Sequence, residues 1–190
     1  MPYQNDAVMN SLLNRRSKPA KTLSAPVPNK KGLLEILNAA ARTPDHGKLV
    51  PWRFIVLQEK TLSNLGKLVE SIGLKDSIPE DKIAKARKQL EGGHLAVAVI
   101  EVQKPSDKIP DIEQTYSVGA VCLALLNAAL AAGWGANWLT GWHVYNKSFL
   151  KNGLKLKNNE SIAGLIYLGT ATITPPERPR PPLDEIVEWL

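Results

Sequence analysis

The sequence predicts an α+β fold rather than a doubly wound sheet. Apolar runs of strand length recur at residues 52–58, 95–103 and 161–171. Segments with helical spacing separate these runs, without the regular alternation that a parallel sheet requires. A long apolar segment, 118–132, has the composition of a buried helix. With 190 residues, of which 44% are apolar, we expect residues 1–190 to form a single domain.

The N-terminal elements are two helices and the linker between them. From the capping-type residue Asp6 onward, apolar residues recur at helical spacing until the basic segment Arg15–Ser17, where the first helix should end. The proline-rich stretch 17–30 is aperiodic and predicts a surface linker. Asn29 then caps a second helix, whose apolar stripe stops at Arg42.

A strand and two helices are expected in the middle of the chain. Residues 52–58 are rich in β-branched and aromatic side chains, as in a strand. Thr61–Ile72 predicts a third helix with Gly73 as its stop, and Pro79–Leu90 predicts a fourth that is charged on most faces. We therefore expect residues 61–92 to form a helical excursion whose last helix faces solvent.

The C-terminal half should contain the most deeply buried elements. Residues 95–103 are almost continuously apolar, which is typical of a central strand covered on both faces. Residues 112–135 form a long segment that is apolar nearly all round and predicts a buried helix. The remaining expected elements are a short strand at 136–141, a helical turn at 144–150, an inner strand at 161–171 and an extended arm at 174–190 that closes with a short helix.

Charge and composition exclude several classes of protein. The net charge is +6, and residues 1–90 contain 16 Lys/Arg against 8 Asp/Glu. No nucleic-acid module is visible and the aromatic residues do not interleave with the charges, so we expect no nucleic-acid partner. The segment 118–132 is too short to span a bilayer, and the N-terminus lacks a signal-peptide pattern. Cys122 lies in an apolar run and predicts a buried filler, so we expect a cytoplasmic protein without a membrane partner.

Asp45 and His46 lie side by side in a loop flanked by proline and glycine. Adjacent residues cannot easily share one metal ion, and His94 and His143 lack ligand spacing, so no metal site is expected. As an acid/base pair they would need a nucleophile, and no Gly-x-Ser-x-Gly motif is present. The simple alternative is a polar loop in which the Asp45 carboxylate accepts a hydrogen bond from its own backbone.

Donor side chains are unusually dense in three short segments. They are Arg15, Arg16, Ser17, Arg42, His46, Lys48 and Arg53. Cations at a helix end need no ligand, but seven donors exceed what a helix end requires and suit a phosphate with a polyol chain. No glycine-rich phosphate loop is present, so side chains would have to hold the phosphate. The segment 133–141 adds backbone donors and tryptophans, with a tight turn beside the core as its alternative.

Five motifs occur in the order found in the nitroreductase family, and together they cover essentially the whole chain. They are NRRS at 14–17, RTPDHGKLVPWRFIVL at 42–57, AALAAGWGANWLTG at 128–141, IAGLIYLGTA at 162–171 and PERPRPPLDEIV at 176–187. The chain resembles in particular a compact bacterial branch of that family. The resemblance implies a nitroreductase-like fold, with a central, mostly antiparallel sheet flanked by helices. It also implies a homodimer in which the C-terminal arm extends onto the partner subunit.

The resemblance implies an FMN-dependent oxidoreductase with NAD(P)H as reductant. Hydride would pass from nicotinamide through flavin to a nitroaromatic, quinone or similar flat electron-poor acceptor, by a ping-pong mechanism. The flavin carries this chemistry, so no catalytic side chain is expected. Two alternatives remain open: a non-catalytic FMN-binding or storage module, and a flavin-dependent dehydrogenase or dehalogenase of a specific metabolite.

The same resemblance assigns the binding residues. The FMN-binding residues would be Arg15, Arg16, Ser17, Arg42, His46, Trp138, Leu139, Thr140, Arg178 and Arg180. The nicotinamide-binding residues would be Ala128, Ala129, Leu130, Ala131, Ala132 and Gly133. Donors such as Arg16 or His46 would stabilise the negative charge of reduced flavin, while Asp45 would order its loop and Trp52 would begin the strand behind it.

Overall fold

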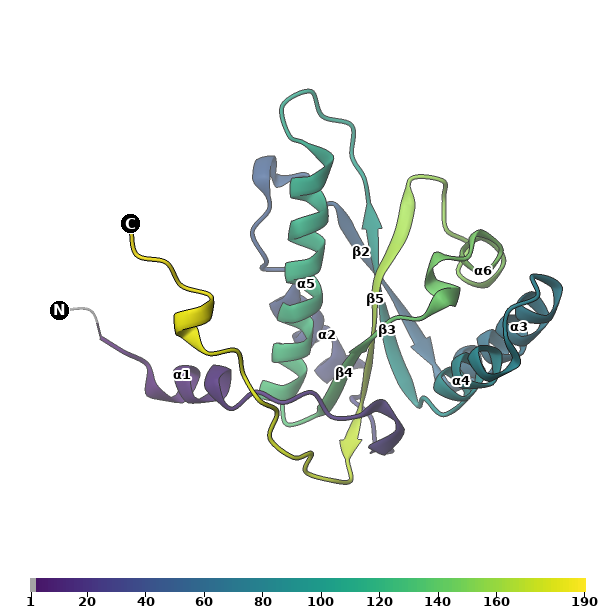
Figure 1. The fold of residues 1–190 in the computed structure, drawn as a ribbon, viewed down its shortest axis with the longest axis horizontal. Helices are drawn as coiled ribbons and strands as arrows, with labels where there is room; N and C mark the ends of the chain where they lie inside the picture. Colours follow the sequence, from purple (N-terminus) through teal and green to yellow (C-terminus); the bar gives the residue numbers. More distant parts are fainter. Residues whose placement is uncertain (1–2) are drawn as a thin grey trace.

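A sheet between two layers of helices organises the protein, whose computed structural model describes residues 3–190 (Figure 1). In that range the sheet has five strands: β1 (Leu23–Ser24), β2 (Trp52–Gln58), β3 (Leu95–Val102), β4 (Gly135–Leu139) and β5 (Glu160–Ala171). The order is β1-β5-β3-β2, and β4 also pairs with β5. Every pair is antiparallel, which confirms the predicted α+β class.

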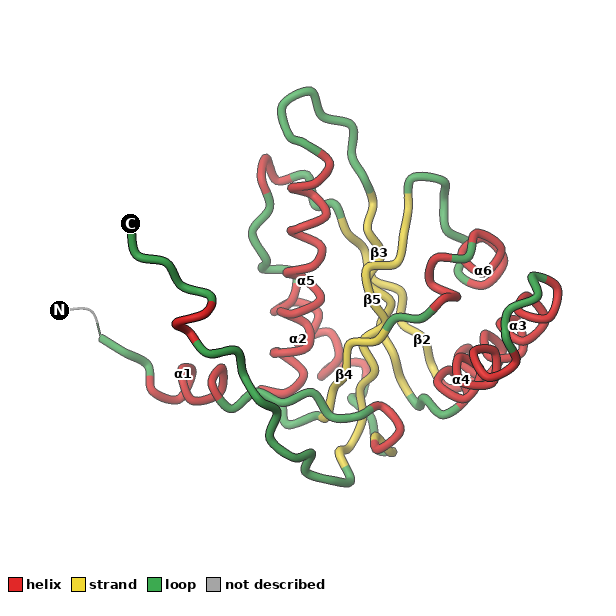
Figure 2. Tube along the Cα trace, viewed as in Figure 1, coloured by secondary structure: helices red, strands yellow, loops and turns green. Residues whose placement is uncertain are grey.

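Helices cover both faces of the sheet. On one side lie α2 (Lys30–Ala40) and α5 (Asp111–Ala131), and on the other lie α3 (Glu59–Lys75), α4 (Glu80–Glu91) and α6 (Lys147–Gly153). The N-terminal α1 (Asp6–Leu13) projects from the sheet and its helical layers. Figure 2 shows that the segment after α1 and the C-terminal arm run mainly as loops, interrupted by short 3₁₀ turns at 20–22 and 183–185.

Strand β3 explains why the protein has two apolar cores. Successive strand residues point to opposite faces, so Leu95, Val97 and Val99 pack under α2 and α5. Ala96, Ala98 and Ile100 pack instead with the core beside α3, α4 and α6. The predicted central strand, covered on both faces, is confirmed.

The long apolar helix α5 belongs to the core beside α2. It buries Val118, Val121, Cys122 and Leu125 completely and contacts α2, β3, β4 and β5. Within the described residues it is the one helix long and apolar enough to cross a membrane, a property that core helices share. Cys122 is fully buried, as expected of a core filler, and burial raises the pKa of its thiol to about 12.

The first two helices differ in their ends from the prediction. Helix α1 is capped by the Asn5 side chain, which accepts a hydrogen bond from the Val8 N–H at 3.2 Å, rather than by Asp6. It ends at Leu13, so Arg15 and Arg16 lie beyond the helix, whose last turn contains no basic residue. Helix α2 is capped by Asn29 as predicted.

The helical pair α3–α4 corrects two expectations. Gly73 does not stop α3, which continues to Lys75; a Cβ at Gly73 would lie 2.6 Å from an Ile83 side-chain carbon, so glycine permits close packing of α4. Helix α4 is also not simply solvent-facing. It buries Ile83, Ala86 and Leu90, because every third or fourth residue of its otherwise charged sequence faces α3 and the sheet.

Candidate functional site

The Arg15–Ser17 segment is held against strand β4. The Lys18 N–H donates to the Ala136 carbonyl at 2.8 Å, and the Asn137 side-chain amide donates to the Lys18 carbonyl at 2.8 Å. These two bonds connect the first basic motif to the strand that carries Trp138 and Leu139. The structure therefore brings together two segments that are about 120 residues apart in sequence.

A cavity of about 450 Å³ opens between this segment, the C-terminal half of α5 and the arm. Its lining residues are Ser11, Leu12, Asn14, Arg15, Arg16, Lys18, Asn127, Leu130, Thr174, Pro175 and Glu177. The wall thus combines cationic and amide side chains with a few apolar ones. Such a donor set suits an anionic ligand with a polar chain.

Two buried polar atoms in this wall have no hydrogen-bond partner in the described part of the chain: Nε of Arg16 and Oδ1 of Asn127. Most buried polar groups in folded proteins are paired, so unpaired ones mark a place where a ligand or water completes the bonding. Asn127 was not predicted from the sequence. The available signal was an amide side chain interrupting the apolar run of α5.

The C-terminal arm contributes Arg180 and Glu177 to the same cluster. Nη2 of Arg180 donates to the Arg15 carbonyl at 3.3 Å, and Nη2 of Arg16 donates to the Pro176 carbonyl. Oε2 of Glu177 lies 3.8 Å from Nε of Arg16, and Oε1 of Glu177 lies 3.3 Å from Nη2 of Arg180. The backbone N–H of Arg178 chiefly lowers the pKa of Glu177, and the two guanidinium groups lower it further. An exposed carboxylate is thus the anion that faces these arginines within one chain.

The two predicted arm arginines are not equivalent. The Arg180 guanidinium reaches the Arg15 segment, whereas Arg178 contacts Glu177 through its backbone N–H. Only Arg180 is therefore placed by a side-chain contact at the cavity within the described residues.

Trp138, Leu139 and Thr140 point in different directions. The Trp138 indole N–H donates to the Ala163 carbonyl at 3.2 Å, and the ring lies where a Cβ at Gly164 would collide with it. Leu139 packs its side chain against the core beside α3 and α6, so this side chain does not face outward. Thr140 is exposed at the end of the strand.

The predicted nicotinamide segment, Ala128–Gly133, forms the end of α5 and its cap. Ala129 is fully buried in the core, while Leu130 lines the cavity. Gly133 adopts φ +84°, a left-handed conformation that glycine accepts readily, and this residue reverses the chain toward β4. The accessible part of the segment is therefore Ala131–Gly133, which is exposed.

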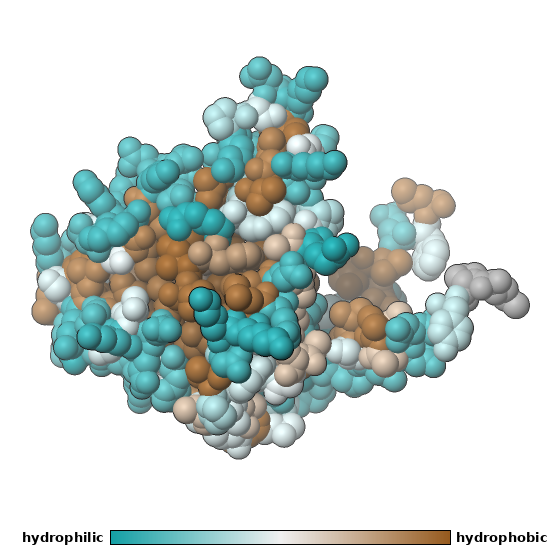
Figure 3. All heavy atoms as spheres, turned by 180° about the vertical axis from the view of Figure 1, so that it is seen from behind, coloured by the Kyte–Doolittle hydropathy of each residue, from teal (hydrophilic) through white to brown (hydrophobic). Residues whose placement is uncertain are grey.

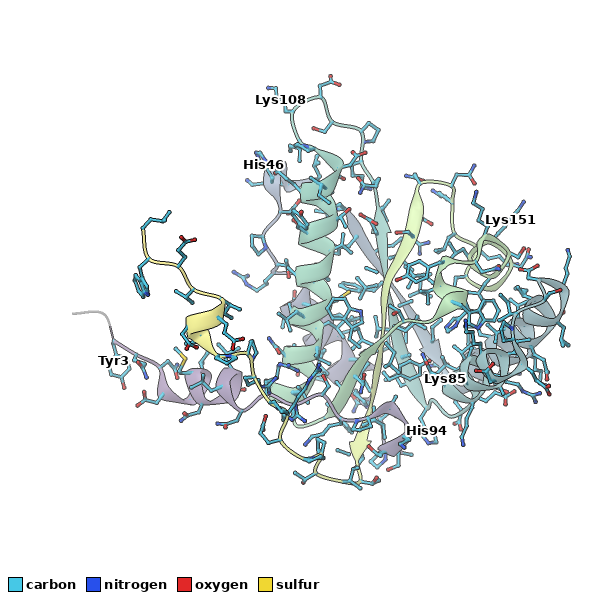
Figure 4. The ribbon with its side chains drawn as sticks, in the orientation of Figure 1. Tyr3, His46, Lys85, His94, Lys108 and Lys151 are labelled. Atoms are coloured by element: carbon cyan, nitrogen blue, oxygen red, sulfur yellow. The ribbon has the colours of Figure 1, made fainter. Side chains whose placement is uncertain are left out.

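Arg42 and His46 lie elsewhere. His46 Nδ1 is 2.7 Å from Oε2 of Glu113, near the N-terminal end of α5. Figure 4 shows His46 at that end, whereas α1 lies beside the opposite end of α5. Arg42 is exposed after α2. Asp45 accepts a hydrogen bond from the Val50 N–H at 2.8 Å, so its carboxylate orders the loop backbone.

Arg53 is not a ligand donor of this site. Its Nε and Nη2 each donate to a Glu160 carboxylate oxygen at 2.8 Å. That pairing is the main cause of a Glu160 pKa lowered to about 2. Of the seven donor side chains predicted from the sequence, Arg53 is therefore already paired within the sheet. Among residues 3–190, no three His, Cys, Asp or Glu side chains are grouped to hold a metal ion.

Comparisons with known proteins agree with the motif order. The family model described as "Nitroreductase family" matches residues 12–170. A "Putative NAD(P)H nitroreductase" of Haemophilus influenzae is 33% identical, covering 84% of this chain and 86% of the relative. YdjA of Escherichia coli, which carries the same description, is 30% identical over 84% and 85% of the two chains.

Solved structures share the fold. A nitroreductase-like family protein from Bacillus cereus matches with a TM-score of 0.80 at 23% identity, over 100% of this chain and 98% of the other. A protein from Desulfovibrio desulfuricans, crystallised with FMN, matches with a TM-score of 0.77 at 18% identity, over 99% of both chains. The nitroreductase-like fold expected from the motifs is confirmed.

Sequence motifs, fold and relatives thus define one class of protein, an α+β oxidoreductase with the nitroreductase-like fold. The chain belongs to the nitroreductase family.

Proposed function

We propose that the protein is an FMN-dependent NAD(P)H oxidoreductase that acts as a homodimer. The observation that carries the proposal is the cavity lined by Arg15 and Arg16, where Arg180 bonds the Arg15 carbonyl and the buried Arg16 Nε has no hydrogen-bond partner. The names of the relatives and the FMN in the Desulfovibrio protein support this choice of cofactor and reductant.

The residues present fit FMN. A phosphate monoester carries up to two negative charges and is bound well by paired guanidinium groups. Arg15, Arg16 and Arg180 would hold the phosphate. The phosphate would take the place of the Glu177 carboxylate, whose exposed side chain can leave without disturbing the core. Asn127 would bond the polar chain of the cofactor through the amide that is now unpaired.

Bound FMN would accept a hydride from NAD(P)H and pass it to a second substrate. The protein's own part is binding, orientation and charge stabilisation. The segment Trp138 to Thr140 would position the ring system, and a cation at the pyrimidine edge of the ring would stabilise negative charge there. Since one open face would serve nicotinamide and acceptor in turn, the kinetics would be ping-pong, with a flat electron-poor acceptor such as a nitroaromatic or quinone.

The proposed homodimer is supported by apolar surfaces that one chain leaves uncovered. Helix α1 buries no residue, and both it and the arm project away from the body of the protein, where Figure 3 shows hydrophobic atoms. The exposed apolar side chains of these segments are Val8, Met9, Leu12, Leu13, Leu183, Ile186, Val187, Trp189 and Leu190. A patch of this kind is typical of a protein–protein interface.

A dimer would also reunite the predicted flavin-binding residues. His46 pairs with Glu113 near the N-terminal end of α5, whereas Arg15 and Arg16 line the cavity with Asn127 and Leu130 near the C-terminal end of that helix. A two-fold interface repeats the same surface on both subunits, so each site could combine Arg15 and Arg16 of one chain with Arg42 and His46 of the partner. This arrangement would explain why the predicted flavin-binding residues form two separate groups on one chain.

The test is the absorption spectrum of the purified protein under nitrogen, with and without NADPH or NADH. We expect a flavin spectrum that bleaches when the nucleotide is added and recovers with a nitroaromatic or quinone. A yellow protein that neither nucleotide bleaches would be the storage module instead. A colourless protein that takes up no FMN would end the proposal, and a monomer in sedimentation would end its dimeric form.

A further inference from the structure

A second cavity, of about 300 Å³, lies between α4 and the turn that follows β4. Its lining residues are Lys82, Lys85, Ala86, Gln89, Thr140, Gly141, Trp142 and His143. Lys85 is labelled on α4 in Figure 4. The volume is at the lower end of those of small-molecule sites, which range from about 300 to 1,000 Å³.

The wall of this cavity contains unsatisfied buried polar groups. His143 is fully buried, and neither of its ring nitrogens has a hydrogen-bond partner among the described residues. Gln89 lies in the same wall, and its side chain reaches the buried Tyr167 hydroxyl, a partner inside the protein. The rings of Trp142 and Phe149 contact the imidazole edge-on, which explains its packing but leaves its nitrogens unpaired. A buried imidazole with both nitrogens unpaired in the cavity wall indicates a polar occupant.

The charges around this cavity specify the kind of occupant. Lys82 and Lys85 stand at its mouth, and no acidic side chain lines it. The ion pairs of α4 in the described residues are made by Arg87, with Glu70 and Glu91, and leave these two lysines available. Lysine ammonium groups, the Gln89 amide and a histidine N–H are all donors. They match the two acceptor oxygens of a carboxylate.

The position of the cavity connects it to the proposed active site. Thr140 and Gly141 line it and directly follow Trp138 and Leu139 of strand β4. A planar molecule lying along this end of the strand would therefore reach the cavity with a substituent. We propose that the cavity binds the carboxylate of the electron acceptor, so that the preferred acceptors are electron-poor aromatic carboxylates. This inference rests on the proposed function.

Binding can be tested apart from turnover by NMR of the full-length protein labelled in its histidines. The His143 ring signals are identified by their loss in His143→Asn, and the probes are benzoate and its neutral analogue benzamide. We expect benzoate to shift the His143 signals saturably and to bind at least about tenfold more tightly than benzamide, the equivalent of about 1.4 kcal/mol. Absence of a saturable shift, or equal binding of the two probes, would mean that water alone fills the cavity.

Charge variants show whether the shift comes from this cavity. The double variant Lys82→Gln/Lys85→Gln should weaken benzoate binding about tenfold or more. Lys88→Gln is the matched control, because Lys88 lies on the same helix but outside the cavity lining. An equal loss in both proteins would indicate general attraction by the helix and would overturn the site.

Turnover separates this inference from the proposed function. The ratio of kcat/KM for 4-nitrobenzoate to that for 4-nitrobenzamide should fall about tenfold in the double lysine variant and stay constant in Lys88→Gln. Flavin reduction by NAD(P)H without any preference for nitrobenzoate would overturn the carboxylate site and leave the proposed function standing. Saturable benzoate binding in a protein that takes up no FMN would overturn the proposed function and leave the carboxylate site standing.

Discussion

Arg53 spans strand β3 to bind Glu160 with two hydrogen bonds of 2.8 Å. Arg53 is on β2 and Glu160 begins β5, and both strands pair with β3. The Glu160 carboxylate is 4% exposed and also accepts the Lys157 N–H, whereas the Arg53 side chain is 40% exposed. The pair therefore links two strands that do not contact each other through backbone hydrogen bonds.

Glu160→Gln should lower the free energy of unfolding by about 1–3 kcal/mol at pH 7, because it removes charge-assisted hydrogen bonds from a half-exposed pair. Urea denaturation at several pH values measures this loss. Since the folded pKa is lowered to about 2, the contribution of Glu160 is complete above its ordinary pKa and disappears as the pH falls toward 2. The exposed Glu35→Gln is the control, and an equal effect of both changes would contradict the prediction.

His143 should make the protein less stable in mild acid. Burial lowers its pKa from 6.5 to about 4, so between these values the unfolded chain binds a proton that the folded protein does not. Unfolding then becomes easier as the pH falls from 6.5 to 4, by at most about 3 kcal/mol. His143→Phe should remove this part of the pH dependence in urea midpoints, whereas His94→Phe, at a partly exposed site, should leave it in place.

Arg180 should matter more than Arg178 for FMN binding. Only the Arg180 guanidinium contacts the Arg15 segment, and a charged hydrogen bond contributes about 1.5–3 kcal/mol. Arg180→Ala should therefore weaken FMN binding about 10- to 100-fold in fluorescence titrations, and Arg16→Ala should do so by a similar factor. Arg178→Ala should change it less than Arg180→Ala, and Lys21→Ala, outside the cavity, should change nothing. An equal loss for both arm arginines would show that the arm rearranges in the dimer.

Mixed dimers test whether each flavin site draws on two chains. Arg16→Ala and His46→Ala proteins should each lose FMN as homodimers. Co-expressed with different tags and purified as mixed dimers, they should regain about half of the wild-type flavin, because one of the two sites then has both halves intact. If all flavin-binding residues came from one chain, every site in the mixed dimer would be defective and no flavin would return.

The sequence predicted the elements that bury a continuous apolar surface. Residues 95–103 could only be a strand covered on both faces, and the structure has β3 there. Gly73 was misread because helix-ending and close-packing glycines look alike until the neighbouring α4 is placed. The two-residue strand β1 was missed within the proline-rich linker, since two residues carry no periodicity.

The site was harder to predict because the sequence shows which side chains can donate hydrogen bonds but not which acceptors of the protein they already bind. Arg53 and Arg16 are the same residue type in the sequence, but β5 supplies two hydrogen bonds from Glu160 to Arg53. Nε of Arg16 has no hydrogen-bond partner and lies 3.8 Å from the exposed Glu177 carboxylate. Likewise nothing local distinguishes His143, buried between aromatic rings, from the exposed His46. The resemblance named the residues, and only the fold showed that one chain separates them.

Helix α5 has a consequence for how this protein can vary. Its 21 residues extend about 30 Å at 1.5 Å per residue, with the His46–Glu113 pair near one end and Asn127 near the other. In the proposed dimer the length of α5 fixes the distance between the two groups of flavin-binding residues on one chain, one with His46 and the other with Arg15 and Arg16. Insertion of a single residue would turn everything after it by about 100° and advance it by 1.5 Å. Loops of the protein can change length freely, but this helix cannot without misaligning both sites at once.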